Sequence, residues 1–77
     1  MNPRFVDHAR ERLLERGIRE IDVQAVLRRP LGDPYPGNRP DTVVLRGYAS
    51  GGLVLKVVVD SSDRELVVTA MWEGARR

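Results

Sequence analysis

The 77-residue chain lacks cysteine and contains a single histidine. Without thiols it can form neither a disulfide bond nor a thiolate metal site, and one histidine does not make a His/Cys zinc cluster within one chain. The sequence also lacks a glycine-rich phosphate loop before a helix and a readable Ser-His-Asp arrangement. We therefore expect no metal and no cofactor, and most enzyme classes have no support.

Long apolar runs are missing as well. No stretch approaches the roughly 20 apolar residues of a membrane span, and the amino terminus has no apolar run of signal-peptide length. These absences predict a soluble cytoplasmic protein without membrane association. The chain length predicts one small domain, residues 1–77, whose site is shallow or shared with a partner.

The charges that are present are mostly arginines. The chain has 13 Lys and Arg residues against 11 Asp and Glu residues, and Lys56 is the lone lysine. Arginine keeps its charge and offers a planar fork that suits phosphate or carboxylate. Contact with nucleic acid and a coding bias towards arginine both explain this composition, and composition alone does not separate them.

The first third of the chain has the pattern of two short helices. Asp7 is a candidate N-cap of the first helix, and Gly17 is suited to end it in a left-handed conformation. A second helix is expected from about Glu20 to Arg28, and Pro30 stops it. The segment from Pro30 to Pro40 holds four prolines and two glycines, which predicts a surface loop.

Three β-rich segments follow this loop, separated by the turn sequences Ser50-Gly51-Gly52 and Ser61-Ser62-Asp63. They are Thr42 to Ala49, Leu53 to Asp60 and Glu65 to Trp72. The predicted fold is therefore α+β, with two N-terminal helices packed on a three-stranded antiparallel sheet in the order ααβββ. The middle segment is the most apolar, as expected of a central strand.

Strict alternation assigns the faces of the last segment. It sets Leu66, Val68, Ala70 and Trp72 against Val67, Thr69 and Met71. Both faces of the predicted sheet carry more apolar area than two short helices can cover. We therefore expect a homodimer or a partner segment on the open face.

The only histidine lies in a stripe at helical spacing. His8, Arg12 and Arg16 are four residues apart, so they lie on neighbouring turns of one helix face, where they can meet an anionic group. Glu11 and Glu15 are close enough to pair with these arginines and to reduce the local positive charge. The alternative interpretation is an ordinary solvated helix face.

Four residues of the strands complete the candidate site. Lys56 is a charge in the middle of the most apolar strand, which is costly unless the ammonium reaches solvent or a partner. Thr69 can hydrogen-bond a ligand, and Tyr48 can stack on a base. The predicted substrate-binding residues are Arg16, Arg46, Tyr48 and Thr69, and the predicted catalytic residues are His8, Arg12 and Lys56.

These residue types suit metal-free cleavage of RNA. In that reaction the ribose 2′-hydroxyl is the nucleophile, and the protein supplies proton transfer and cations for the phosphorane. A histidine that titrates near neutrality serves as base or acid, and arginine forks bind the non-bridging oxygens.

The order of motifs resembles a widespread family of small bacterial proteins with the pattern H-A-x-x-R-x-x-x-R-G-I. The pattern falls on residues 8–18, and Leu55-Lys56-Val57-Val58-Val59-Asp60 and Val67-Val68-Thr69-Ala70-Met71-Trp72 resemble the closing strands of that family. The family is in turn similar to the RelE-like toxins, so the resemblance extends over nearly the whole chain.

This resemblance implies two helices on a curved antiparallel sheet and a ribonuclease that needs no metal. Its partners would be RNA, for example mRNA on the ribosome, and a small antitoxin. By motif position the site residues would be His8, Arg12, Arg16, Lys56 and Thr69. Many RelE-like toxins have a tyrosine or second histidine near the carboxyl terminus, whereas this chain has neither after Trp72. The second proton-transfer group is therefore unassigned.

Two other functions remain open. A non-catalytic regulatory module would use the same arginines to bind RNA or an acidic protein. A dimeric domain would use the apolar sheet face as its contact and bind no nucleic acid.

Overall fold

The computed structural model describes residues 3–74, which form two α-helices and a five-stranded mixed sheet. The helices are α1 (Ala9–Glu15) and α2 (Glu20–Arg28), and a short 3-10 helix covers Ser50–Gly52. The strands are β1 (Arg4–Phe5), β2 (Tyr35–Pro36), β3 (Thr42–Tyr48), β4 (Val54–Asp60) and β5 (Asp63–Trp72).

The strand order is β1-β5-β4-β3-β2, with β1 parallel to β5 and every other pair antiparallel. The prediction of a three-stranded antiparallel sheet is therefore wrong, although the fold is α+β. The missed strands β1 and β2 have two residues each, which is too short for an alternating pattern to be visible. The prediction that the most apolar strand is central is confirmed, because β4 lies in the middle of the sheet.

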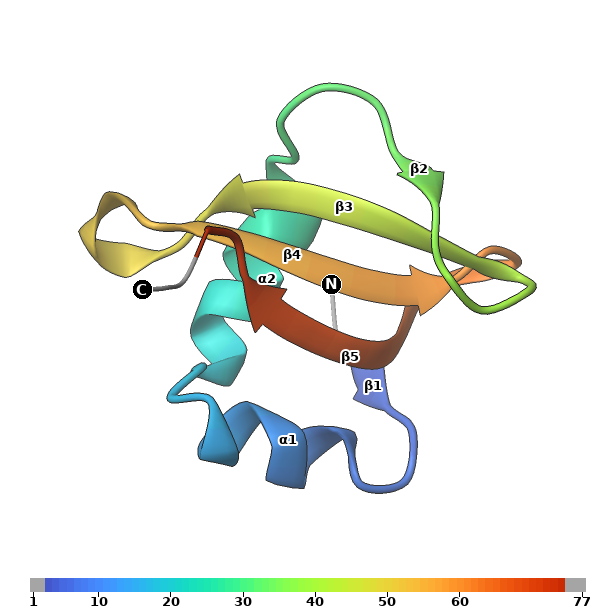
Figure 1. Ribbon diagram of the computed structural model, residues 1–77, viewed down its shortest axis with the longest axis horizontal. Helices are drawn as coiled ribbons and strands as arrows, with labels where there is room; N and C mark the ends of the chain where they lie inside the picture. Colours follow the sequence, from blue (N-terminus) through green and yellow to red (C-terminus); the bar gives the residue numbers. More distant parts are fainter. Residues whose placement is uncertain (1–2, 75–77) are drawn as a thin grey trace.

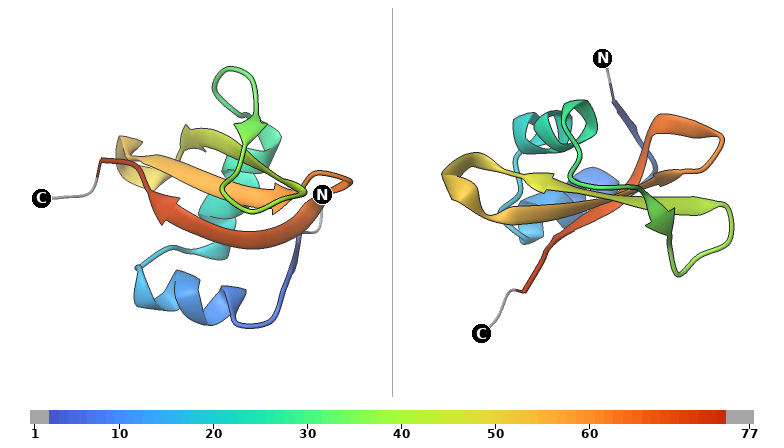
Figure 2. Two further views of the ribbon diagram at one scale, coloured as in Figure 1. Left: turned by 45° about the vertical axis from the view of Figure 1, so that its right-hand side comes forward. Right: turned by 90° about the horizontal axis from the view of Figure 1, so that it is seen from above.

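The two helices have different positions on the sheet. In Figure 1, α2 lies behind β3 and β4, and α1 lies beyond β5, at the edge of the sheet where β1 is added. The right-hand view of Figure 2 shows α2 on one side of the sheet only. Within residues 3–74 this arrangement leaves the other side, which we call the open face, without a covering helix.

The helix boundaries follow from local signals in most places. The predicted span Glu20 to Arg28 of α2 is confirmed, and Gly17 has the expected left-handed conformation, with φ of 68°. The predicted N-cap is wrong, because His8 rather than Asp7 caps α1, and it does so without a side-chain hydrogen bond.

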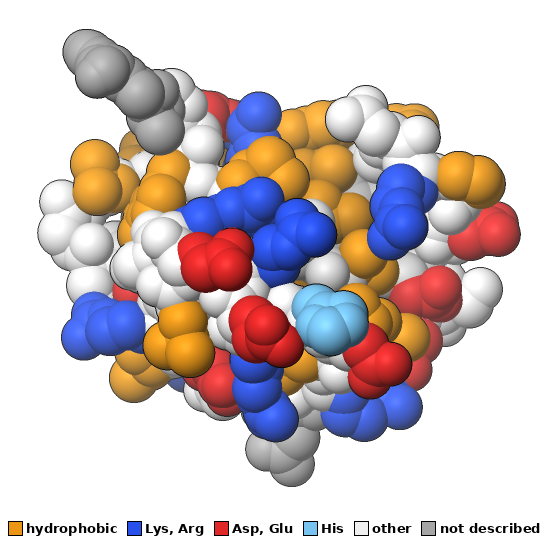
Figure 3. Space-filling view, turned by 60° about the horizontal axis from the view of Figure 1, so that its bottom comes forward, with side chains coloured by type: hydrophobic (Ala, Val, Ile, Leu, Met, Phe, Trp, Pro, Cys, Tyr) orange, Lys and Arg blue, Asp and Glu red, His pale blue; other side chains and the backbone are white. Residues whose placement is uncertain are grey.

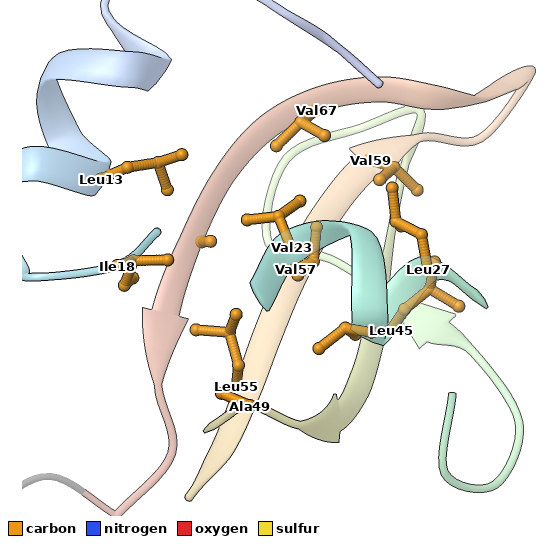
Figure 4. Packing of buried hydrophobic residues seen from close by; sticks show 12 residues of the cluster. Leu13, Ile18, Val23, Leu27, Leu45, Ala49, Leu55, Val57, Val59 and Val67 are labelled. Carbon is orange, nitrogen blue, oxygen red and sulfur yellow. The ribbon is translucent and has the colours of Figure 1, made fainter. Parts of the chain in front are cut away.

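The hydrophobic core lies between the helices and the covered face of the sheet. Four apolar side chains from the helices and the turn between them point towards strand side chains such as Leu55 and Val57 (Figure 4). They are Leu13, Ile18, Val23 and Leu27. Gly47 of β3 allows a close approach of α2, since a Cβ atom there would press on Val26 at 3.1 Å. The core therefore uses one face of each strand and leaves the other face free.

The predicted faces of the last strand are partly wrong. Val59 pairs with Val67, but Val58 pairs with Thr69, so Val68 is an extra residue at a β-bulge. Val67 and Ala70 are consequently both fully buried, although strict alternation sets them on opposite faces. Thr69 and Met71 then lie on the open face, together with Lys56 and Val58.

None of the helices in residues 3–74 has the length and apolar character that crossing a membrane would need.

Candidate functional site

A pocket of about 660 Å³ opens on the open face of the sheet. The segment from Val6 to Arg16 forms one wall, and residues 35–39 form the other. Its floor consists of strand side chains that point away from the core. These are Val44, Lys56, Val58, Val68, Thr69 and Met71.

Five of the seven predicted site residues line this one pocket. They are His8, Arg12, Arg16, Lys56 and Thr69. The first three come from α1 and its two cap residues, and the others come from β4 and β5, about 40 to 60 residues further along the chain. Parts of the sequence that are far apart therefore meet at one surface hollow.

His8 lies where β1 gives way to α1. Its φ of 68° is in the left-handed region, which few side chains other than Asn, Asp and His adopt. The Nδ1 atom lies 3.1 Å from Oε1 of Glu11, and the imidazole is 77% exposed. When Nδ1 carries the proton it donates to Glu11, so the carboxylate orients the ring and leaves Nε2 as the acceptor.

Arg16 is fixed to β5 by both its side chain and its backbone. Its Nη1 donates to Oγ1 of Thr69 at 3.1 Å and to the carbonyl of Ala70 at 2.7 Å. The indole Nε1 of Trp72 donates to the Arg16 carbonyl at 2.7 Å. The predicted ligand-binding residue Thr69 thus holds the Arg16 guanidinium over the floor of the pocket.

Arg12, Arg39 and Lys56 are the available cations of the pocket. Within residues 3–74 none of these three side chains makes an ion pair or a hydrogen bond. The predicted pairing of Glu11 and Glu15 with the stripe arginines is wrong in this part of the chain, because Glu11 contacts His8 instead. Figure 3 shows Lys and Arg side chains gathered beside the pale blue histidine, with orange apolar side chains beyond them.

Arg46 and Tyr48 lie on the open face of β3 but do not line the pocket. Arg46 donates from Nε and Nη2 to the two oxygens of Glu73, at 2.6 and 2.8 Å. The hydrogen bond and charge of Glu73 raise the pKa of Arg46, and the same hydrogen bond lowers the pKa of Glu73. The charge of Lys56 makes a smaller contribution that also lowers the pKa of Glu73.

Tyr35 and Arg39 line the wall formed by residues 35–39, although the sequence did not predict them as site residues. A long loop has no periodicity from which a facing direction can be read. One signal was available, since Tyr35 lies between Pro34 and Pro36. The residue before a proline favours extended backbone, and an extended aromatic residue next to a sheet can join its edge.

Within the described part of the chain, His, Cys, Asp and Glu side chains nowhere gather in threes as a metal site requires. The titratable groups that line the pocket are one imidazole, one phenol, four cationic groups and the carboxylate of Asp7. This set can bind an anion and transfer a proton.

The fold and the site together define this protein as a small α+β domain with a basic surface pocket. The chain belongs to the DUF4258 family, described as a domain of unknown function, whose family model matches residues 5–72. The match confirms the prediction of a small family without an assigned function, and it spans every pocket residue. Comparisons with curated proteins and with solved structures gave no match.

Proposed function

We propose that this protein is a metal-independent endoribonuclease of the toxin-antitoxin type, which cleaves RNA through attack of the ribose 2′-hydroxyl. The observation that carries the proposal is the convergence of His8, Arg12, Arg16 and Lys56 around one pocket. Proton transfer and a cluster of cations are what this cleavage needs when no metal is used.

Each of these residues has its own role in the cleavage reaction. His8 accepts the proton of the 2′-hydroxyl through Nε2 while the 2′-oxygen forms a bond to phosphorus. Arg12 and the fixed Arg16 bind the non-bridging oxygens of the phosphorane. The bond from phosphorus to the 5′-oxygen then breaks, and Lys56 stabilises the charge on the leaving oxygen, which recovers a proton from water. The products are a 2′,3′-cyclic phosphate and a 5′-hydroxyl.

The similarity to RelE-like toxins adds a regulatory partner to the proposal. A small antitoxin would cover the pocket and keep its cations from RNA, whether the RNA is free or bound to the ribosome. Acidic side chains suit that role, because the pocket lining holds four cationic groups and one carboxylate. A short acidic reading frame beside the gene, whose product restores growth when both are expressed, is the expected companion.

Cleavage assays with end-group analysis test the proposal. Purified protein is incubated with single-stranded RNA in EDTA, and in parallel with mRNA on ribosomes in magnesium buffer. We expect 2′,3′-cyclic phosphate ends in at least one assay, and a rate about 10²- to 10⁴-fold lower for the His8→Ala, Arg12→Ala double variant. Arg28→Ala, on α2 and outside the pocket lining, is the matched control. Equal yields from the double variant and the wild type would reject the proposal.

A second candidate function is binding of RNA without cleavage. The 77% exposure of the His8 side chain favours it, since an imidazole so open to water is less enclosed than most catalytic bases. This function predicts salt-sensitive association with RNA and no cyclic phosphate product in either assay.

A further inference from the structure

One row of paired residues crosses the open face. Tyr35 pairs with Val44, Val44 with Val58, and Val58 with Thr69. Directly paired residues of neighbouring strands present their side chains on the same face of a sheet. The row therefore runs across the pocket from an aromatic ring at one wall to the Thr69 hydroxyl, which holds Arg16, at the other.

The middle of this row is apolar and largely shielded. Val44 is 7% exposed and Val58 is 9% exposed, although no helix covers this face. Arg46, Lys56 and Met71 form the next row, in which Lys56 is the cation without a partner among the described residues. A planar apolar group fits beside the Tyr35 ring, and an anion fits beside Arg12 and Arg16.

The arm that carries Tyr35 is fixed by its own hydrogen bonds. The Gly37 N–H donates to the Thr42 carbonyl at 3.0 Å, and the Thr42 hydroxyl donates to the Arg39 carbonyl at 2.7 Å. A side chain at Gly37 would collide with that hydroxyl. The backbone that carries Tyr35 is thus held in position before a ligand arrives, which lowers the entropy lost on binding.

Tyr35 lines the wall of the pocket that lies opposite the segment from Val6 to Arg16. The ring, which is partly exposed, is the part available to a ligand in the pocket.

We infer that the pocket selects single-stranded RNA by stacking one unpaired base on Tyr35 while Arg12, Arg16 and Lys56 hold the adjoining phosphate. This assignment rests on the proposed function, for which it names the substrate class and a specificity-determining residue. A base inside a duplex is already stacked and paired, and its faces are closed to a side chain. An unpaired base offers its face, and stacking on an aromatic ring accepts any base.

Binding of RNA that cannot be cleaved tests the stacking site separately from catalysis. The probe is a 2′-O-methyl oligonucleotide carrying 2-aminopurine, used single-stranded or annealed to its complement, with anisotropy for affinity and 2-aminopurine fluorescence for stacking. We expect the single strand to bind at least 10-fold more tightly than the duplex, with quenched fluorescence. Tyr35→Ala and Tyr35→Leu should both lose roughly 5- to 100-fold in affinity and abolish the quenching.

Two further variants show whether the loss of RNA affinity comes from the aromatic ring of Tyr35. Tyr35→Phe keeps the ring and should stay within about threefold of the wild type, because stacking needs no hydroxyl. Tyr48→Ala removes an exposed tyrosine that does not line the pocket, and we expect it to bind like the wild type. Leucine fills the Tyr35 position without an aromatic face, so a loss shared by Tyr35→Leu does not come from a cavity at β2.

The outcomes separate the two proposals. Equal affinity of Tyr35→Leu and the wild type, or equal binding of duplex and single strand, would overturn the stacking site even if RNA is cleaved. Binding that depends on Tyr35, with no cyclic phosphate from natural RNA, would support the stacking site and reject the ribonuclease.

Discussion

The two faces of the sheet differ although they are built from alternate residues of the same strands. Leu55, Val57 and Val59 of β4 are fully buried against the helices, whereas Lys56 between them faces the pocket. One face holds the fold together by excluding water, and the other presents charge to water. Substitutions one residue apart should therefore affect either stability or binding, and rarely both.

The largest effect is expected on the covered face. Leu55→Ala should lower the free energy of unfolding by about 2–5 kcal/mol, because it removes a large side chain from a close-packed core. Urea denaturation followed by circular dichroism measures the change. Leu53→Ala, at a position that is 62% exposed, is the matched control and should change stability little. Similar losses in the free energy of unfolding at both positions would contradict this difference between the two faces.

A buried carboxylate on the same side gives the next largest effect. Asp22 accepts hydrogen bonds from the N–H and hydroxyl of Ser50, at 3.0 and 2.8 Å, and from Arg19 at 3.3 Å. These bonds tie α2 to the turn after β3. Asp22→Asn should cost about 1–3 kcal/mol at neutral pH, because it weakens the bonds to a buried group.

The pH dependence of stability gives a second test of the role of Asp22. Burial raises the pKa of Asp22, but the hydrogen bonds from Ser50 and Arg19 outweigh burial and hold it below its usual 3.8. A lowered pKa in the folded state stabilises the protein above pH 3.8, and the stabilisation is lost as the pH falls through the folded value. The wild type should lose more stability than Asp22→Asn between pH 5 and pH 3, by urea denaturation. Parallel acid profiles would contradict this role.

On the open face, Lys56→Gln should change binding and leave stability nearly unchanged. Removing one phosphate contact should lower the slope of log affinity against log salt by about 0.7 for a single strand. Anisotropy titrations of 2′-O-methyl RNA at several salt concentrations give the slope. Arg28→Gln, on the helix side, should keep the slope of the wild type. A Lys56→Gln slope equal to that of the wild type would exclude Lys56 from the phosphate site.

The smallest effect is expected at the border of the pocket, where a substitution should increase the affinity for RNA. Glu73 neutralises Arg46, which is paired across the sheet with Lys56. Glu73→Gln removes a partly exposed ion pair, so stability should change little. It also frees the Arg46 charge, so RNA should bind modestly more tightly at low salt and with a steeper salt slope. Weaker binding by Glu73→Gln would show that the ion pair positions the site.

Sequence patterns predicted the elements with strong local signals. Helix α2 has charged residues at its start and Pro30 after its end, and Gly17 supplies the left-handed turn between the helices. The edge strands β1 and β2 depend on pairing with Leu66 and Val44, which are distant in the sequence. Two residues carry no period, so only the assembled sheet reveals these strands.

The β-bulge at Val68 could not be predicted from the sequence for a related reason. Val67, Val68 and Thr69 all favour strands, and neither glycine nor proline marks the extra residue. The packing of Val67 and Ala70 into one core decides the local register, and that packing is a tertiary effect. Moving Thr69 to the open face is what lets it hold Arg16.

The candidate site was predictable where it follows a helix or strand period. His8, Arg12 and Arg16 share a face by helical spacing, and Lys56 stood out as a charge in an apolar strand. Arg46 was predicted as a substrate-binding residue but lies outside the pocket, and its pairing with Glu73 depends on a turn after β5 that the sequence does not specify. Tyr35 lies in the two-residue strand β2, which is too short to show a period.

Mapping of the RNA contacts by NMR shows directly whether the open face is the functional surface. A 2′-O-methyl RNA trinucleotide is titrated into ¹⁵N-labelled protein, and backbone amide shifts are followed by NMR. We expect shifts confined to the β1–α1 junction, residues 35–39, and the middle of β4 and β5. Shifts centred on the outer surface of α2, or no shifts at a concentration where anisotropy reports binding to the longer probe, would contradict it.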